Sequence, residues 1–319
     1  MNEVYLGIDI GSVSTNIVTV DAIDTKKVYD TFYIRTNGQP LAAVRDGLSR
    51  LSDKGYTDEN IKGVGVTGSA RLLIGNVLGA DIVRNEITAH AVAAINQHPE
   101  VRTVLEIGGQ DSKIITIKDG LVTDFAMNTI CAAGTGSFLD QQSNRLDMGI
   151  EEFSKTALES SSPVRIAGRC TVFAESDMIH KQQLGYEKKD IIAGLCEALV
   201  RNYLNNVAKG KELAPPILFQ GGVAFNSGII HAFEKELGEK LTIPDHFNVM
   251  GALGIAILVK EFNGTGGNTN FRGFELSQQK ISLKPLYCDE CANNCELTQA
   301  SSEEKVLSIW GDRCGKWQN

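Results

Sequence analysis

Strand-like patterns of hydrophobic residues open the chain. Three runs, Val4 to Ile10, Thr15 to Val20 and Val28 to Arg35, are rich in β-branched and aromatic residues and are separated by polar turns. We expect three adjacent strands, with Asp9 at the end of the first and facing whatever is held by the amides and hydroxyls of Gly11, Ser12, Val13 and Ser14. An aspartate in this place usually serves Mg²⁺ or a water molecule. The pattern alone is also typical of simple turn chemistry.

Further along, apolar residues alternate between strand and helix spacing. Strands are predicted at Ile61 to Thr67, Thr103 to Ile107, Lys113 to Ile117, Leu121 to Phe125 and Pro215 to Gln220. Helices are predicted at Pro40 to Lys54, Asn85 to Gln97, Thr135 to Leu146, Ile150 to Leu158, Val172 to Gln183, Glu187 to Lys209, Ser227 to Leu237 and Met250 to Phe262. The chain is therefore expected to be an α/β protein.

Composition narrows the class. The 319 residues, 42% of them apolar, suit two packed domains. A net charge of -8 gives no electrostatic reason to expect nucleic acid or an anionic membrane as partner. The start lacks the basic region of a signal peptide, and no apolar run reaches the roughly 18 to 20 residues of a membrane span. We expect a cytoplasmic protein whose seven cysteines are reduced, metal-bound or buried.

A glycine pair follows the fifth predicted strand. Without Cβ atoms, Gly108-Gly109 lets backbone amides approach an anion closely, and Asp111 and Lys113 follow at once. Both Asp9 and Asp111 follow strands that would open onto a cleft between domains. We predict that they converge on Mg²⁺ and the phosphates of a nucleotide, with Gln110 as a second candidate for orienting the attacking water.

Two cysteines precede predicted helices. Cys131 comes before a run of small residues that includes Gly134 and Thr135, two candidate nucleotide contacts, and Cys170 comes before Val172 to Gln183. Free N–H groups and the helix dipole favour a thiolate or an anionic ligand at such junctions. Two cysteines are too few for a closed four-ligand metal site, but two copies of the chain would supply four.

A second glycine pair follows the strand Pro215 to Gln220. Gly221-Gly222 would let a flat ring or a ribose approach the backbone, with Ala224 and Asn226 as further candidate contacts. An ordinary strand-turn-helix corner would show the same pattern. Two other residues are read more simply: His90 as a packed or capping residue, and Cys196 as a buried small hydrophobe.

The end of the chain differs in composition. Asn263 to Asn270 has the composition of a linker and precedes a tail with closely spaced cysteines: Cys288, Cys291, Cys295 and, 19 residues later, Cys314. This spacing is more typical of a zinc or iron–sulfur site than of free thiols. The residues alone do not decide which metal is bound.

The order of these motifs resembles a known superfamily. Gly7 to Asn16, Glu106 to Lys113 and Gly221 to Asn226 are similar to the phosphate 1, phosphate 2 and adenosine motifs of the actin, Hsp70 and sugar-kinase ATPases. With Asn128 to Leu139 and Arg169 to Ser176 added, the chain resembles the BadF/BadG/BcrA/BcrD subgroup, which activates 2-hydroxyacyl-CoA dehydratases and supplies the ATPase subunits of benzoyl-CoA reductase. The resemblance covers about residues 3 to 262.

The resemblance implies a domain plan and cofactors. Two ribonuclease H-like domains would flank a nucleotide cleft that binds ATP or ADP with Mg²⁺. The first would be residues 1–92, completed by a helix at 250–262, and the second residues 93–249, with residues 263–319 as linker and Cys-rich tail. It further implies a homodimer with one 4Fe-4S cluster, ligated by Cys131 and Cys170 of both subunits, in agreement with the count of two cysteines per chain.

The implied activity is ATP-dependent electron transfer. Hydrolysis would drive a low-potential electron, taken from a ferredoxin or flavodoxin, into an iron–sulfur dehydratase or reductase, and domain closure is the usual vehicle for such coupling. Two alternatives stay open: a small-molecule kinase of the same superfamily, which would have no use for the two cysteines, and a nucleotide-dependent scaffold without turnover.

Two features depart from the family pattern. Asn16 stands where family members commonly carry lysine at the end of phosphate 1. The Cys-rich tail is absent from the short dehydratase activators and resembles a segment of longer activase-like proteins. The chain could thus be the front part of a larger protein, or serve a less familiar acceptor such as a double-cubane cluster protein.

Overall fold

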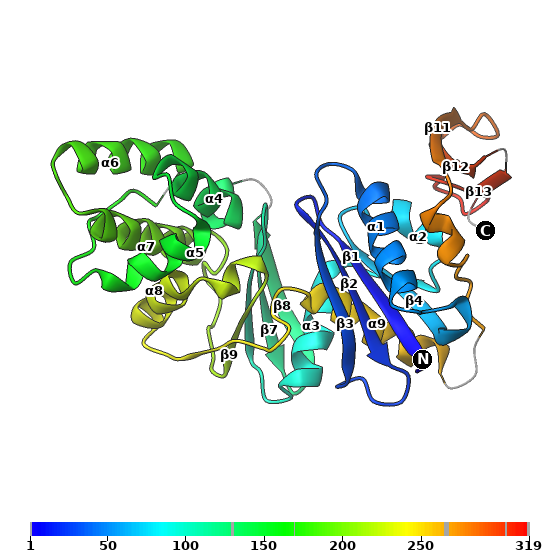
Figure 1. The fold of residues 1–319 in the computed structure, drawn as a ribbon, viewed down its shortest axis with the longest axis horizontal. Coiled ribbons are helices and arrows are strands. Elements are labelled where there is room, and N and C mark those ends of the chain that lie inside the picture. Colours follow the sequence, from blue (N-terminus) through cyan, green and yellow to red (C-terminus); the bar gives the residue numbers. More distant parts are fainter. Residues whose placement is uncertain (1, 129–130, 169, 265–267, 304, 318–319) are drawn as a thin grey trace. The chain divides into compact units, whose positions relative to one another are not determined.

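The computed structural model describes residues 2–128, 131–168, 170–264, 268–303 and 305–317 (Figure 1). The cysteine-flanking motifs include residues 129–130 and 169, which lie outside the described residues. The chain forms two compact units. Unit 1 contains Met1–Ala93 and Gly251–Asn319, and unit 2 contains Ala94–Met250. The cleft expected between two domains stays a prediction.

Unit 1 is built on a five-stranded sheet. Its strands are β1 (Val4–Ile10), β2 (Ser14–Asp21), β3 (Val28–Arg35), β4 (Ile61–Gly68) and β5 (Ile82–Val83), in the order β3-β2-β1-β4-β5. The first three strands pair antiparallel, whereas β4 lies parallel to β1 and β5 parallel to β4. Every residue of β1 is buried, as expected for a central strand covered on both faces.

Unit 2 repeats this strand plan. Its strands are β6 (Thr103–Ile107), β7 (Ser112–Lys118), β8 (Leu121–Asn128), β9 (Ile217–Gln220) and β10 (Leu241–Thr242), in the order β10-β9-β6-β7-β8. Strands β6, β7 and β8 form an antiparallel meander, and β9 and β10 continue the sheet in parallel. Strand β6 thus holds the place that β1 holds in unit 1, and β7 and β9 correspond to β2 and β4.

Helices cover the sheets largely where the apolar spacing predicts them. They are α1 (Pro40–Asp53), α2 (Arg71–Leu78), α3 (Glu86–Gln97), α4 (Gly136–Arg145), α5 (Ile150–Thr156), α6 (Thr171–Gln183), α7 (Lys188–Asn206), α8 (Ser227–Leu237) and α9 (Met250–Asn263). Single 3-10 turns lie at Asp58–Asn60, Ala132–Gly134, Ala157–Glu159, Gly222–Phe225 and Phe274–Ser277. Within the described residues, no helix combines the length and the apolar character needed to cross a bilayer.

Glycine allows α9 to lie directly against the sheet of unit 1. A Cβ atom at Gly7 of β1 would lie 1.9 Å from the carbonyl oxygen of Ala252, and one at Gly254 would lie 1.7 Å from that of Ala89 in α3. Real Cβ atoms do not approach so closely, so both positions require glycine. The start of α9 is thereby fixed beside the end of β1.

The tail is folded, which the sequence pattern does not predict. Strands β11 (Ile281–Tyr287), β12 (Glu296–Ser302) and β13 (Lys305–Trp310) form a small antiparallel sheet, seen in orange and red in Figure 1. The segment before it is joined to unit 1: Asp81 accepts hydrogen bonds from Thr269 and from the amide of Asn270. The tail therefore belongs to unit 1.

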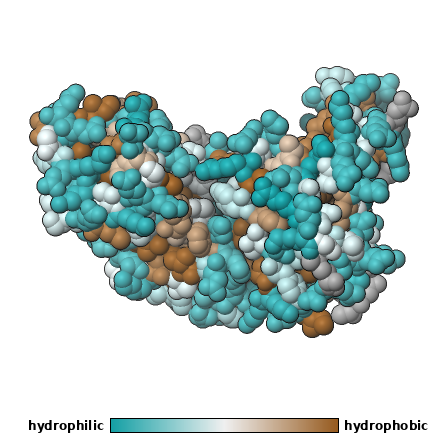
Figure 2. Space-filling model, viewed as in Figure 1, coloured by the Kyte–Doolittle hydropathy of each residue, from teal (hydrophilic) through white to brown (hydrophobic). Residues whose placement is uncertain are grey.

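Polar side chains cover most of the face shown in Figure 2, with brown apolar patches between them. In unit 2, large apolar side chains are exposed along strand β8 and helix α6. Those on the helix include Val172 and Phe173, which are 67% and 64% exposed and lie two and three residues after Cys170.

Candidate functional site

Hydrogen bonds within the turn and from Thr36 fix the conformation of the turn between β1 and β2. The amide of Gly11 donates to the carbonyl of Ser14 at 2.8 Å, and Thr36 binds the turn twice, through its hydroxyl to Gly11 and its amide to Val13. Ser12 is exposed at the tip, while Val13 and Ser14 are partly buried. The predicted phosphate 1 residues therefore form a compact, preorganised turn in unit 1.

Asp9 lies beneath this turn among other buried polar groups. It is 8% exposed and pairs across the sheet with Asn16 of β2 and Thr67 of β4. Residues paired in this way point to the same face of a sheet. Within the described residues, Oδ1 of Asn16 and Oγ1 of Thr67 are buried without a hydrogen-bond partner. Such unpaired oxygens are costly unless a ligand or water completes them.

Two glycines bring further elements against Asp9. A Cβ atom at Gly68, where φ is +92°, would lie 2.5 Å from Oδ1 of Asp9. One at Gly251 would lie 2.2 Å from Oδ2 of Asp9 and 3.3 Å from Nε2 of His90. His90 is 6% exposed and packs as predicted. The contribution of the two glycines is missing from the sequence-based site, because it depends on contacts between distant segments.

In unit 2 the glycine turn after β6 is docked on a helix. The amide of Gly108 donates to the carbonyl of Asp111 at 3.0 Å, which closes the turn. The amides of Gly136 and Ser137, at the start of α4, donate to the carbonyls of Gly108 and Gly109 at 2.9 and 2.8 Å. Carbonyl oxygens are thus held on the helix side of the turn.

Lys113 lies inside unit 2. It is 1% exposed, and its Nζ lies 2.8 Å from Oε2 of Glu106 and 3.0 Å from Oδ1 of Asp111. The hydroxyl of Tyr203 donates to the carbonyl of Lys113 at 2.6 Å, and burial raises the pKa of Tyr203 well above its ordinary value. This placement favours a role for Lys113 in orienting Asp111. Gln110, by contrast, is exposed.

Gly221, the first residue of the second glycine pair, lies close to the carboxylate of Glu106. Gly221 has φ +92°, and a Cβ atom there would lie 2.7 Å from Oε1 of Glu106. Ala224 is buried in the following 3-10 turn, between Gly222 and Phe225. Asn226 is fully buried and caps α8 by accepting from the amide of Ile229 at 3.1 Å. Asn226 is therefore a helix cap, and an asparagine directly before a predicted helix is a sequence signal for this role.

Cys131 and Cys170 are both half-buried in unit 2. Cys170 precedes α6 directly, as predicted. Cys131 is followed by the 3-10 turn Ala132–Gly134, and α4 begins at Gly136, one residue after the predicted start at Thr135. The backbone of Cys131 is held by Asn128, whose amide side chain binds both the Cys131 N–H and its carbonyl.

One side chain lies against the loops of both cysteines. Asn202 of α7 is 1% exposed, and its Nδ2 donates to the carbonyl of Gly168 at 2.5 Å. Its Oδ1 would lie 2.8 Å from a Cβ atom at Gly134, so this glycine is needed for the close approach. Thr135 is buried beside it and donates to the carbonyl of Ala132. Gly134 and Thr135, which are predicted to contact the nucleotide, thus lie in the loop that follows Cys131.

Helices α4 and α6 are joined near these loops. Glu175 of α6 accepts from Gln141 at 3.1 Å and forms an ion pair with Arg145 at 2.7 Å. Among the other cysteines, Cys196 is 1% exposed, and burial raises the pKa of its thiol to about 12. It is the buried hydrophobe that the helix pattern predicted.

Asp9 belongs to unit 1 and Asp111 to unit 2, so their convergence on one nucleotide stays a prediction. In the part of the chain that the structure describes, no three His, Cys, Asp or Glu side chains are gathered as they would be around a bound metal ion. Each metal site predicted from the sequence therefore stays a prediction as well.

The repeated sheet plan and the glycine turns define an α/β ATPase of the actin and sugar-kinase type. The chain belongs to the BadF/BadG/BcrA/BcrD ATPase family, which it matches over residues 6–259. It is 33% identical over 254 residues to the 2-hydroxyisocaproyl-CoA dehydratase activator of Clostridioides difficile, covering 79% of this chain and 93% of that protein. It is 32% identical over 257 residues to the (R)-2-hydroxyglutaryl-CoA dehydratase activating ATPase of Acidaminococcus fermentans, covering 81% and 97%.

Solved structures agree with this assignment. Component A of (R)-2-hydroxyglutaryl-CoA dehydratase from Acidaminococcus fermentans superposes with a TM-score of 0.76 at 31% identity, covering 82% of this chain and 99% of that chain. The activator of 2-hydroxyisocaproyl-CoA dehydratase from Clostridium difficile, with bound ADPNP, gives 0.75 at 31% identity, covering 81% and 95%. A glucokinase from Streptomyces griseus, at 13% identity and a TM-score of 0.51, shares the fold alone.

Proposed function

We propose that this ATPase is an electron donor that activates a partner iron–sulfur enzyme, a 2-hydroxyacyl-CoA dehydratase or a related reductase. The family assignment and the names of its relatives support the activity. The single observation that carries the proposal is Asn202, because one buried side chain hydrogen-bonds the loop before Cys170 and lies against Gly134 in the loop after Cys131. A kinase would have no need of two half-buried cysteines held in this way.

The end of β1 would hold Mg²⁺ with the phosphates of ATP. Asp9 supplies a carboxylate, while Asn16 and Thr67 supply buried oxygens that have no hydrogen-bond partner in the described structure. Oxygen ligands of this kind suit a hard cation, which usually keeps several waters in its shell. The departure from lysine at Asn16 fits this role, because an amide oxygen can accept from a metal-bound water and an ammonium group cannot.

The turn of unit 2 would complete the nucleotide site. Lys113 holds one oxygen of Asp111 at 3.0 Å, so the second oxygen is kept in a fixed direction. We place Asp111 near the attacking water or the metal, with Gln110 exposed at the same turn and able to orient that water. Gly221 and Gly222 would lie against the adenosine.

Cys131 and Cys170 would bind a 4Fe-4S cluster together with the same two residues of a second chain. The cluster, when bound, supplies one-electron redox chemistry at a low potential. The donor set fits: both thiols are half-buried, and the exposed Val172 and Phe173 beside Cys170 give a surface for a twofold interface. Ferredoxin or flavodoxin would deliver the electron in the cytoplasm, and ATP would control its transfer to the acceptor.

Anaerobic purification tests the proposal directly. We expect about four iron atoms and four sulfides per dimer in protein that hydrolyses ATP. Cys131→Ala and Cys170→Ala should each abolish this iron completely, because either change removes two of four ligands per dimer. Cys196→Ala is the matched control, since Cys196 is buried in the core of unit 2, and it should keep the iron.

A cluster that persists in either ligand variant would contradict the bridging arrangement. Iron that is lost while ATP turnover persists is expected, because Asp9 and Asp111 lie outside the cysteine loops. A protein that phosphorylates a small molecule and binds no iron would instead support the kinase alternative.

A further inference from the structure

We propose that the tail is a zinc-binding module in which Cys288, Cys291, Cys295 and Cys314 ligate one Zn²⁺ ion per chain. This proposal goes beyond the proposed function, because the family match ends at residue 259 and the tail lies outside the matched residues. The sequence predicts a metal there but not which one, and the fold of the tail supplies the missing argument.

The hairpin of β11 and β12 brings two of the cysteines side by side. Tyr287 pairs with Glu296 in the sheet, and beyond this pair the amide of Cys288 donates to the carbonyl of Cys295 at 2.9 Å. Both cysteines are buried, at 7% and 8% exposure, and Cys291 lies exposed in the turn that joins them. Three thiols therefore belong to one hairpin end.

Strand β13 returns the fourth cysteine to the same end. Trp310 pairs with Thr298, and a Cβ atom at the following Gly311 would lie 2.7 Å from the carbonyl oxygen of Glu296. The segment that contains Cys314 therefore starts beside the hairpin end that carries Cys295.

Two contacts fold this last segment over the hairpin. Trp317 packs against the buried cluster of Cys288, Cys295 and Leu297, and Lys316 forms an ion pair with Glu290, the neighbour of Cys291. Cys314 is flanked by these contacts, and its thiol is directed at Asp312 at 3.5 Å. All four cysteines thus lie at one end of the small sheet, although no three of them are closed around a common point in the described structure.

The size of the core gives a reason for a metal. Among the described residues, the apolar cluster at this end has Cys288, Cys295 and Leu297 buried, with Leu286, Ile309 and Trp317 packed against them. A core of this size contributes little apolar surface to the stability of a small sheet. Small domains of this kind are commonly held by a structural metal, and binding closes the ligands as it folds the site. The metal would supply what the core lacks.

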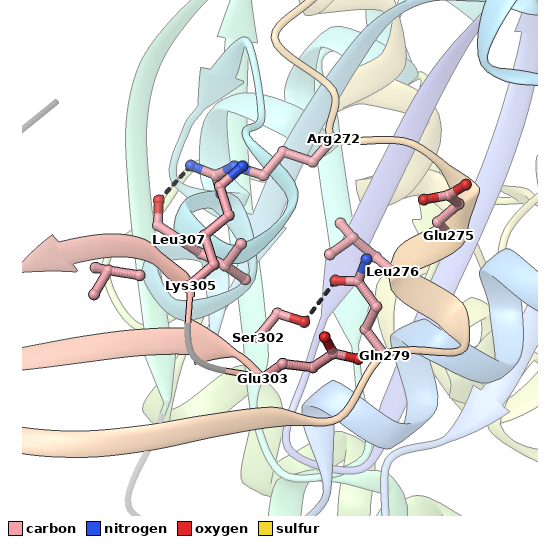
Figure 3. A pocket seen from close by; sticks show the side chains of 9 residues that line it. Arg272, Glu275, Leu276, Gln279, Ser302, Glu303, Lys305 and Leu307 are labelled. Carbon is pink, nitrogen blue, oxygen red and sulfur yellow. Dashed lines mark hydrogen bonds between the residues drawn. The ribbon is translucent and has the colours of Figure 1, made fainter.

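The other end of the sheet is anchored to unit 1. Arg272 donates to the carbonyl of Val77 in α2 and to that of Leu307 in β13, at 2.9 and 2.7 Å, and Ser302 donates to Gln279 (Figure 3). Arg272, Gln279, Ser302 and Leu307 border a pocket of about 460 Å³, which the 3-10 turn at 274–277 also lines. Strand β12 separates Ser302 from Cys295 by seven residues, or about 20 Å in a strand. The cysteine end is thus the end without this anchor.

Zinc fits this thiol set better than a cluster does. Tetrahedral zinc with Zn–S bonds of about 2.3 Å places its sulfurs about 3.8 Å apart. Cysteines whose backbones are directly hydrogen-bonded across a hairpin, as Cys288 and Cys295 are, suit this short separation. Four thiolates also form a closed site without an open position, which is typical of a structural rather than a catalytic ion.

Metal analysis of the full chain tests the site. We expect one zinc per chain in the wild-type protein and at least a tenfold loss in Cys288→Ser, Cys291→Ser, Cys295→Ser and Cys314→Ser. Cys131→Ser should lose iron and keep zinc, and Cys196→Ala should keep both. Because zinc and iron are measured separately, failure of this site and failure of the proposed function give different results.

A second measurement does not depend on the variants. Alkylation of the wild-type protein, followed by mass spectrometry, should leave the four tail thiols unmodified until a zinc chelator is added, even though Cys291 and Cys314 are exposed. After chelation, Co²⁺ alone should restore protection and give thiolate-to-cobalt absorption. Zinc content unaffected by all four substitutions, tail thiols that react freely before chelation, or iron that is lost in Cys314→Ser but kept in Cys131→Ser would each overturn the proposal.

Discussion

The two sheets carry an acidic side chain at the same position, but the residue opposite it is neutral in unit 1 and a lysine in unit 2. Asp9-Ile10-Gly11 ends β1, and Glu106-Ile107-Gly108 ends β6. In each unit a glycine with φ +92°, Gly68 or Gly221, approaches the acidic side chain from the parallel neighbouring strand.

The residue opposite the acid differs between the units. Asp9 faces Asn16, a neutral residue whose Oδ1 has no hydrogen-bond partner in the described structure, whereas Glu106 faces Lys113 and is neutralised by it. A buried carboxylate beside an unpaired amide oxygen is suited to a cation from outside. A carboxylate paired with a buried lysine is suited to holding the neighbouring turn in place. We therefore propose that the same strand plan gives unit 1 a ligand position, whereas in unit 2 it holds an internal ion pair.

The largest expected effect is on the folding of unit 2. Lys113→Met removes the buried ammonium between Glu106 and Asp111 and leaves their charges uncompensated, so the free energy of unfolding should fall by about 3–5 kcal/mol. Urea denaturation followed by fluorescence measures this.

Two controls separate charge from packing in that experiment. The double variant Glu106→Gln/Lys113→Met should recover much of the loss, because it leaves less unpaired charge. Asn16→Ala, at the matching position of unit 1, should change the unfolding free energy by less than about 1 kcal/mol, since its Oδ1 has no partner to lose. Equal losses at Lys113 and Asn16 would remove the distinction between the two units.

Asp9→Asn tests the ligand position of unit 1. Without the carboxylate, ATP turnover should fall by about 100-fold or more, because the metal or the attacking water is no longer positioned. The fold should be retained, since the amide has the same shape as the carboxylate. The steady-state release of phosphate at saturating Mg²⁺ and ATP is the measurement, and activity near that of the wild type would exclude Asp9 from the mechanism.

The two paired glycines should respond alike in stability. Gly221 has φ +92° and ψ 171°, a conformation that is nearly restricted to glycine, and a Cβ atom there would also contact the carbonyl of Ile107 at 2.4 Å. Gly68→Ala and Gly221→Ala should each cost about 1–3 kcal/mol of unfolding free energy. Gly120→Ala is the control, because Gly120 has φ +74° and no atom within 4 Å of its Cβ position, and it should cost less.

Thermal or urea denaturation of the three variants measures these differences in unfolding free energy. If Gly120→Ala proves as destabilising as the other two, the contacts with Asp9 and Glu106 contribute nothing.

The smallest effect concerns alkaline pH. Burial raises the pKa of Tyr203 above its ordinary value near 10, so the unfolded chain loses this proton at a lower pH than the folded chain does. The resulting stability is fully present below about pH 10 and is lost as the pH rises further. Tyr203→Phe should cost about 1 kcal/mol at pH 8, for the lost hydrogen bond to Lys113, and should flatten the decline in stability above pH 10.

Unfolding curves between pH 8 and 11 for both proteins give the comparison. A decline of the same steepness in Tyr203→Phe would assign the alkaline loss to other groups, such as Tyr56 of unit 1, whose pKa burial raises to about 12.

Local patterns predicted most of the fold, because runs of β-branched residues and apolar residues at helical spacing report burial directly. The strand at Val4–Ile10 and the helix at Ser227–Leu237 have the predicted bounds. Helix α2 was not predicted, since it has only eight residues and contains Gly75. The tail sheet was missed because its first strand is mostly exposed and contains Pro285.

The candidate site was predictable in composition but not in geometry. Gly108-Gly109, Asp111 and the two cysteines stand out as motifs, yet whether Lys113 reaches a ligand or a neighbouring carboxylate depends on the register of β6 and β7. Asn202 carries no local signal, because it is one polar residue within an amphipathic helix. Its role follows only from the packing of loops that are distant in the sequence.

The place of Asn202 and Tyr203 in α7 has a mechanical consequence. Successive residues of a helix point about 100° apart, so these neighbours face different parts of unit 2: Asn202 contacts the cysteine loops, and Tyr203 binds the strand that carries Lys113. The 19-residue helix α7 therefore contacts both regions of unit 2 through two neighbouring residues. A small rotation of α7 would therefore displace the cysteine loops together with Lys113, the residue that holds Asp111, because no flexible segment separates Asn202 from Tyr203.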